Sequence, residues 1–231
     1  RRVHQLRQHV RAIDQLHQAR RIARPEVLTP LAHGVAGLGD QQVQARRVGR
    51  LALRRVGADV VRIEHAVAIA TDYHAGPLTL LHNGHTVQAN FAPGSTLTSG
   101  GHSYPLAQVH FHTPSEEAFN GKHYPMVAHF VHKDAEGHLA VLGIMFVEGA
   151  ENPELAKLIE HAPKTSAPAQ DVAGVTFNPA ALLPPDLHVY RYTGSLTTPP
   201  CSEGVLWLVL QQPVPVAQDQ IGVFSRLYPM N

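Results

Sequence analysis

Residues 108–112 read Gln108-Val109-His110-Phe111-His112, an alternation of polar and apolar residues that favours a β-strand over a helix. Successive side chains on a strand point to opposite faces, so His110 and His112 share one face with Gln108. The apolar Val109 and Phe111 take the other face. Two imidazoles at this spacing start roughly 6.5 to 7 Å apart at their Cα atoms and can converge on one cation. Two ligands alone are too few for a specific metal site.

A third histidine lies in a second alternating stretch, Val127-Ala128-His129-Phe130-Val131. The dipeptide Asn120-Gly121 between the two stretches is a turn signal, so we expect the two strands to be antiparallel neighbours. That pairing places His129 beside the first two histidines. Three neutral nitrogen ligands with an open fourth position are typical of a catalytic zinc site. The single cysteine, Cys201, excludes a disulfide within the chain and thiolate sites of the iron–sulfur or blue-copper kind.

The chain after residue 72 carries short strand patterns separated by turns. Apolar alternation and β-branched or aromatic residues predict strands at 78–81, 86–91, 107–112, 126–132, 139–146, 188–193 and 206–210. Asn152 as N-cap and Pro153 at the first helical position predict one helix, and a weaker helical pattern covers residues 216–226. We therefore predict a mostly β single domain, built on a largely antiparallel central sheet with a few short helices.

The first 72 residues differ in composition from the rest of the 231-residue chain. They hold 13 Arg, no Lys and six acidic residues, whereas residues 73–231 hold six basic and 12 acidic residues and all 14 aromatic ones. An amphipathic pattern over residues 2–22 predicts a basic helix. We divide the chain into an atypical Arg-rich segment, residues 1–72, helical or disordered, and a domain of residues 73–231.

Composition excludes several classes of protein. No stretch approaches the roughly 20 apolar residues of a membrane span, and the N-terminus shows no signal-peptide pattern. The basic helix pattern is compatible with contact to a membrane surface or to nucleic acid, but the formal net charge of the chain is only +1. We expect a small-molecule substrate, no membrane span and no nucleic-acid partner.

Several motifs follow one another in a recognisable order and spacing: Asn83-Gly84-His85, Gln108–His112, Ser115-Glu116, Ala128–His132, Ala140–Ile144 and Tyr192–Pro200. In this respect residues 73–231 resemble the alpha-class carbonic anhydrases, and their bacterial members most of all. The resemblance implies a zinc lyase that reversibly hydrates carbon dioxide to bicarbonate and a proton. It also implies a periplasmic or secreted location and a catalytic domain that is incomplete at both ends.

Four residues match the metal centre of this family. The resemblance implies that His110, His112 and His129 hold Zn2+ and that Gln108 orients one of these ligands. Val127 departs from the family, which usually has at this position a glutamate hydrogen-bonded to the third ligand. Losing such a partner typically costs about 10- to 100-fold in metal affinity or activity.

Other residues match the family's reaction and substrate positions. The resemblance implies that Thr197 orients the nucleophile while donating its own proton to Glu116, because an ionised carboxylate only accepts hydrogen bonds. His85 would relay protons to solvent, since imidazole titrates near neutral pH. Thr198 would line the bicarbonate side. The apolar wall that receives carbon dioxide would consist of Val131, Val141, Leu196 and Trp207.

Two further departures concern Glu117 and Cys201. Glu117 stands where the family usually has a histidine, which puts two carboxylates side by side near the core. Cys201 matches a cysteine that exported bacterial members pair with a partner in their N-terminal part. We cannot identify that part in residues 1–72.

Two alternative interpretations remain open. The spacing His110-x-His112-x-x-x-Glu116 also satisfies the first metal motif of the cupins, in which Glu116 would be a ligand of iron or manganese. The chain could also be a carbonic anhydrase-like binding module without turnover. Metal analysis distinguishes the first alternative, and a carbon dioxide hydration assay distinguishes the second.

Overall fold

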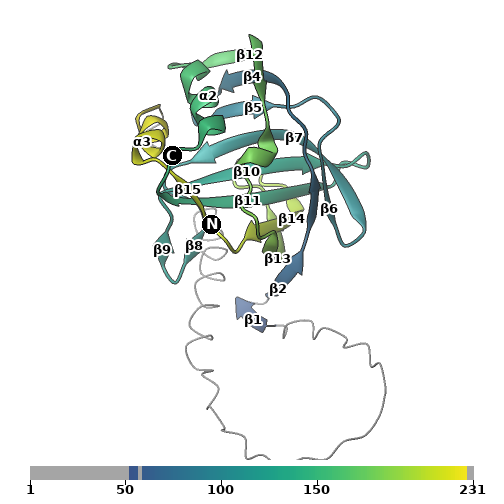
Figure 1. Cartoon of the computed structure of the whole chain (residues 1–231). Helices are drawn as coiled ribbons and strands as arrows, with labels where there is room; N and C mark the ends of the chain where they lie inside the picture. The colour runs from purple at the N-terminus through teal and green to yellow at the C-terminus, as the bar shows by residue number, and fades with distance from the viewer. Residues whose placement is uncertain (1–51, 57–58, 228–231) are drawn as a thin grey trace, which may run out of the picture.

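The computed structural model of the chain describes residues 52–56 and 59–227 (Figure 1). Most of the structure is one 13-stranded sheet, in which ten strands follow the order β1-β2-β13-β14-β11-β10-β7-β5-β4-β12 and three more attach at its sides. The strands are β1 Ala52–Val56, β2 Asp59–Ala68, β3 Ala70–Asp72, β4 Gly76–His82, β5 Val87–Asn90, β6 Thr96–Ser99, β7 His102–His112, β8 Ala118–Phe119, β9 Lys122–His123, β10 Met126–Lys133, β11 Leu139–Glu148, β12 Ala167–Phe177, β13 His188–Ser195, β14 Glu203–Leu210 and β15 Val214–Val216. The helices are α2 Pro153–His161, η1 Pro179–Leu182 and α3 Gln218–Leu227.

The sheet is largely antiparallel, as predicted from the strand patterns. Parallel pairing occurs where β11 meets β14 and β15, while the other strand pairs of the described chain are antiparallel. Each of the seven predicted strands is present with shifted ends. The prediction of a mostly β fold with few helices is therefore confirmed.

Helix α2 begins at the predicted residue. The side chain of Asn152 accepts hydrogen bonds from the backbone N–H groups of Glu154 and Leu155, both at 3.0 Å. Pro153 lacks the N–H that would remain unpaired at this end. The weaker helix prediction, over residues 216–226, corresponds to α3.

The boundary at residue 72 does not mark the edge of the fold. Strand β2 pairs with β13, and Arg191 Nη1 lies 3.3 Å from Glu64 Oε2 across that pair. Strand β3 pairs with β6. For residues 52–56 and 59–72 the expectation of helix or disorder was wrong, because pairing with later strands decides their conformation. The helix predicted over residues 2–22 lies outside the described residues.

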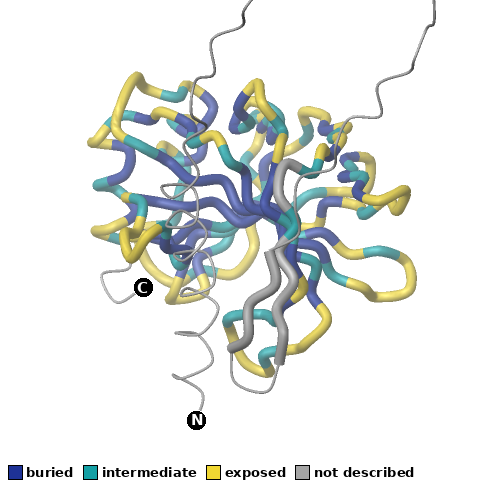
Figure 2. The backbone as a smooth tube through the Cα atoms, turned by 90° about the horizontal axis from the view of Figure 1, so that it is seen from below, coloured by how far each residue is buried: buried dark blue, intermediate teal, exposed yellow. Residues whose placement is uncertain are grey.

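The two faces of the sheet carry different buried clusters. The larger cluster joins Phe111 of β7 and Phe130 of β10 to the helices, with the rings of Phe111 and Phe224 of α3 4.7 Å apart. The smaller cluster lies on the opposite face and includes Val127 and Trp207. Figure 2 shows that the buried backbone gathers in the middle of the sheet. Among the described residues no helix has the length and apolarity needed to span a membrane.

Candidate metal centre

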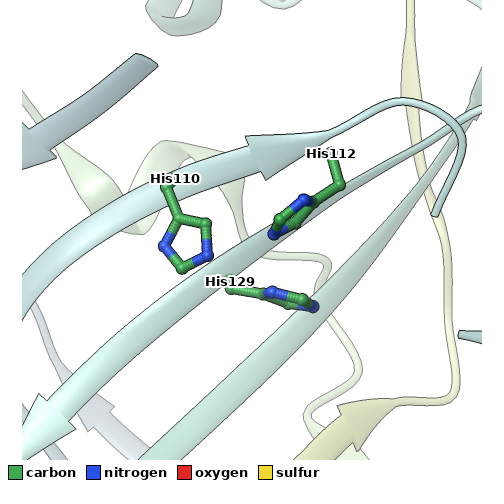
Figure 3. A group of neighbouring side chains, drawn as sticks. All are labelled: His110, His112 and His129. Carbon is green, nitrogen blue, oxygen red and sulfur yellow. The ribbon is translucent and has the colours of Figure 1, made fainter. Parts of the chain in front are cut away.

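Three histidines meet on the face of the sheet that carries the smaller cluster (Figure 3). Strands β7 and β10 are neighbours, and His129 is directly opposite His110 in their register. One nitrogen of each ring lies within 4.8 Å of the corresponding nitrogens of the other two, and the ring centroids are 4.9 to 5.3 Å apart. Strand alternation and antiparallel pairing thus bring His110, His112 and His129 together, as the sequence predicted.

Hydrogen bonds on the side away from the cluster hold the rings of His110 and His129. Gln108 Oε1 accepts from His110 Nδ1 at 2.8 Å, which leaves His110 Nε2 as the ligand nitrogen. Glu117 Oε1 accepts from His129 Nε2 at 2.8 Å. Because a carboxylate only accepts, Nε2 of His129 carries the proton and the lone pair is on Nδ1. These bonds fix the ring tautomers in the form that a metal requires.

The two adjacent carboxylates occupy different places in the site. Glu117 is buried behind His129, whereas the side chain of Glu116 is 27% exposed. Glu116 Oε2 lies 3.8 Å from His112 Nε2 and 3.9 Å from His129 Nδ1, beyond hydrogen-bond distance. Within the described part of the chain this oxygen is buried and has no hydrogen-bond partner. Glu116 therefore presents an acceptor beside the point where the histidines converge.

Burial and charge set the protonation of the ligands. Burial lowers the pKa of His110 well below its ordinary value, and the neighbouring His129 and His112 lower it further. Burial also acts to lower the pKa of His129, but the charge and hydrogen bond of Glu117 outweigh it and raise this pKa. His110 is thus neutral at physiological pH, which is the form that binds a metal.

The donor set fits zinc. The site offers three imidazole nitrogens and no thiolate, and other side chains hold the rings through hydrogen bonds. This is a common environment for a catalytic Zn2+. A second group, Asp134, Glu136 and His138, lies on the turn after β10. Asp134 is half-buried and the other two residues of this group are exposed. The carboxylate of Asp134 accepts from His138 Nδ1 at 2.8 Å. That hydrogen bond accounts for the arrangement without an ion.

The four residues predicted to form an apolar wall lie together. Val141 and Trp207 are buried in the smaller cluster, and Val131 and Leu196 pack against it. The indole of Trp207 meets the ring of His129 edge-on with centroids 5.2 Å apart, and its N–H donates to a backbone carbonyl. This places the apolar cluster directly beside the histidines.

Two of the predicted site residues lie in the segment that follows β13. Thr197 is half-buried and Thr198 is exposed. The carbonyl of Thr198 accepts from the N–H of Cys201 at 2.8 Å. Among the described residues no hydrogen bond joins Thr197 to Glu116, so the structure does not form the contact that the resemblance implies.

His85 lies at the same end of the strands as His112. Its N–H donates to Asn83 Oδ1 at 2.9 Å in the turn between β4 and β5, and its side chain is exposed. The next residue, Thr86, donates from Oγ1 to the carbonyl of Phe111 at 2.8 Å. The turn that carries His85 is therefore attached to β7 one residue before His112.

Comparison with known proteins gives a consistent result. The family profile described as eukaryotic-type carbonic anhydrase matches residues 60–231, so the match begins 13 residues before our composition boundary. A carbonic anhydrase of Pectobacterium carotovorum is 46% identical over 155 residues, which are 67% of this chain and 63% of that protein. The chain thus spans somewhat less than two thirds of such relatives. One from Klebsiella pneumoniae is 44% identical over 174 residues, 74% of this chain and 70% of that protein.

Solved structures show the same likeness. The alpha-carbonic anhydrase of Photobacterium profundum aligns with a TM-score of 0.66 at 39% identity, over 79% of this chain and 82% of that one. The alpha-carbonic anhydrase of Thermovibrio ammonificans, in complex with the inhibitor sulfanilamide, aligns with a TM-score of 0.66 at 40% identity. That alignment covers 69% of this chain and 70% of the other.

Proposed function

The chain belongs to the eukaryotic-type, or alpha-class, carbonic anhydrase family, and from this premise we propose that it catalyses the zinc-dependent reversible hydration of carbon dioxide to bicarbonate and a proton. The observation that carries the proposal is the convergence of His110, His112 and His129 beside an apolar cluster. The cupin interpretation, with Glu116 as a metal ligand, is not supported, because the family match includes both strands of the site.

The chain's own residues prepare the metal centre. His110, His112 and His129 would hold zinc, while Gln108 and Glu117 fix two of the rings from outside. Bound zinc supplies a water nucleophile at neutral pH by lowering the pKa of that water, as is known for carbonic anhydrases. The neutral state of His110 favours binding of the ion, because proton and metal compete for the same nitrogen.

Glu116 sets the direction of hydrogen bonds on the open side of the site. As an ionised carboxylate it only accepts, so a hydroxyl next to it must point its proton toward Glu116 and its lone pairs away. We assign this hydroxyl to Thr197, which requires the segment after β13 to approach Glu116. The unpaired Oε2 of Glu116 is available for that bond. Thr198 would then face bicarbonate.

Carbon dioxide is apolar and needs a dry surface beside the nucleophile. The wall formed by Val131, Val141, Leu196 and Trp207 supplies such a surface. The product proton must leave a buried site, and the exposed imidazole of His85, at the same end of the strands as His112, is suited to transfer it to buffer. The periplasmic or secreted location implied by the resemblance stays a prediction.

Metal analysis and a hydration assay test this function together. Zinc-reconstituted protein should contain one zinc ion and hydrate carbon dioxide, and a sulfonamide should inhibit it. His110→Ala should abolish zinc binding. His102→Ala is the matched control, because His102 is exposed at the start of the same strand. Protein that stays metal-free after reconstitution would reject the proposal, and zinc-loaded protein without turnover would instead favour a binding module.

The relay assignment has its own test. His85→Ala should leave zinc bound and slow turnover in weak buffer, with recovery at high buffer concentration because buffer then removes the proton directly. His102→Ala, at an exposed histidine at the start of β7, is again the matched variant. Wild-type turnover by His85→Ala at low buffer concentration would remove His85 from the mechanism.

A further inference from the structure

The carboxylate of Glu117 is buried against one metal-site histidine. Its Oε1 accepts from His129 Nε2 at 2.8 Å, and the two side chains are only 5% and 1% exposed. Because water is excluded, this is the interaction that decides which ring nitrogen of His129 carries the proton. The other nitrogen, Nδ1, then faces His110 and His112.

The loop that carries Glu117 is anchored independently of the three metal-site histidines. Ser115 N donates to the carbonyl of Tyr124 at 2.9 Å, and Tyr124 N donates to Ser115 Oγ at 2.9 Å. Ser115 Oγ in turn donates to the carbonyl of Glu117 at 2.6 Å. His123 Nδ1 donates to the carbonyl of Ser115 at 2.6 Å. The backbone of Glu117 is thus held in place whether or not a metal is present.

Gly143 leaves room for the carboxylate. It is the residue of β11 directly opposite His129 in the register with β10. A Cβ at Gly143 would lie 3.3 Å from Glu117 Oε1, which is tighter than ordinary van der Waals contact. The backbone of Gly143 does not have a positive φ, so close approach of the carboxylate is the feature that favours glycine here.

We propose that Glu117, held by the Ser115–Tyr124 contacts and accommodated by Gly143, is the positioning residue that sets the tautomer and orientation of His129 for metal binding. The inference rests on the proposed function, because it concerns the same zinc site. Val127 shares the face of His129 two residues earlier on β10, but its apolar side chain offers no acceptor. The carboxylate that supports this ligand therefore comes from the loop before β8.

The dissociation constant for Zn2+ tests the proposal, measured by competition with a chromophoric chelator. Glu117→Gln keeps the side-chain volume and removes the charge, and we expect it to weaken zinc binding about 10-fold; Glu117→Ala should weaken it up to about 100-fold. Glu154→Gln is the matched control, since Glu154 is also buried but bonds Asn178 and Lys157. It should bind zinc as the wild type does.

A double-mutant cycle separates positioning from general damage to the fold. Gly143→Ala should weaken zinc binding in the wild-type background and have little effect in Glu117→Ala, because the carboxylate that it displaces is already gone. Urea unfolding of each metal-free variant reports its stability separately. If Glu117→Ala does not fold, the same cycle is run with Glu117→Ser, whose short side chain likewise leaves the space beside Gly143 free. Independent, additive effects of the two substitutions would contradict the inference.

The two proposals fail in different ways. A wild-type chain that binds no zinc would overturn the proposed function and this inference with it. A wild-type chain that binds zinc, with Glu117→Gln and Glu117→Ala binding it equally well, would overturn the role of Glu117 alone. Weakened binding by the Glu117 variants, with an unchanged Glu154→Gln, supports the role.

Discussion

Acidification should destabilise the fold through His132. This side chain is fully buried, and its Nε2 accepts from the hydroxyl of Tyr73 at 2.7 Å. Its Nδ1 lies 3.2 Å from the carbonyl of Ala140 and donates to it. Burial lowers the pKa of His132 from 6.5 to about 4, against a smaller opposing effect of backbone hydrogen bonds. The folded protein therefore keeps His132 neutral over a pH range in which the unfolded chain protonates it.

The sign and size of the effect follow from this difference in pKa. Between pH 6.5 and about 4 the unfolded state binds a proton that the folded state does not, so stability falls as the pH falls. At about 1.36 kcal/mol per pKa unit, His132 alone removes about 2 kcal/mol between pH 7 and pH 5 and about 3 kcal/mol by pH 4.

Urea unfolding at pH 7, 6 and 5 measures this contribution, with His132→Gln as the reference protein. The glutamine retains an oxygen that can accept from Tyr73, and the other titrating groups contribute equally to both proteins. The variant is expected to be less stable at pH 7 and to approach the wild type by about 2 kcal/mol at pH 5. A stability difference that does not change with pH would refute the reasoning, as would an NMR titration that gives His132 an ordinary pKa.

Three other substitutions test the core, a helix end and the metal centre. Asn152→Ala should cost about 1 kcal/mol in urea unfolding because two N–H groups lose their acceptor, and an unchanged midpoint would show that the cap is not needed. Phe111→Ala should cost about 3 to 5 kcal/mol, since the fully buried ring packs on Phe224; a loss below about 1 kcal/mol would contradict that packing. Gln108→Ala should weaken zinc binding about 10-fold with little loss of stability, because His110 Nδ1 loses its acceptor. An unchanged affinity for zinc would show that Gln108 does not support the metal centre.

Strand periodicity explains why the histidine cluster was predictable. On β7 and β10 the side-chain period of two assigns each residue to a face, and the pairing of His110 with His129 follows once the strands are antiparallel neighbours. The same alternation assigns Phe111 and Phe130 to the opposite core. The alternation of residues along each strand agrees with the faces seen in the structure, because one face of each strand is apolar and must be buried.

Other strands are defined by pairing and could not be read from local sequence. Residues 167–177 form β12 against β4, yet most of its side chains are exposed and the register shifts twice. An exposed strand of this kind carries no alternation to detect. Strand β2 lies in the Arg-rich segment without aromatic residues, and its conformation depends on β13, more than 100 positions later. The change in composition predicted a boundary at residue 72, but strand pairing joins residues on both sides of it.

The two departures at Val127 and Glu117 appeared independent in the sequence: the first predicted a weaker metal centre, and the second placed two carboxylates side by side near the core. The structure connects them, because the Nε2–H of His129 can be satisfied by one acceptor and Glu117 already supplies it. A second carboxylate at position 127 would lie on the same face and compete for that single donor while adding a buried negative charge. Valine at this position instead extends the apolar cluster around Trp207. Glu117 on the loop before β8 therefore takes over the hydrogen bond that the missing acceptor on β10 would have made to His129. Sequence spacing alone could not reveal this replacement, because the path of the loop decides whether Glu117 reaches His129.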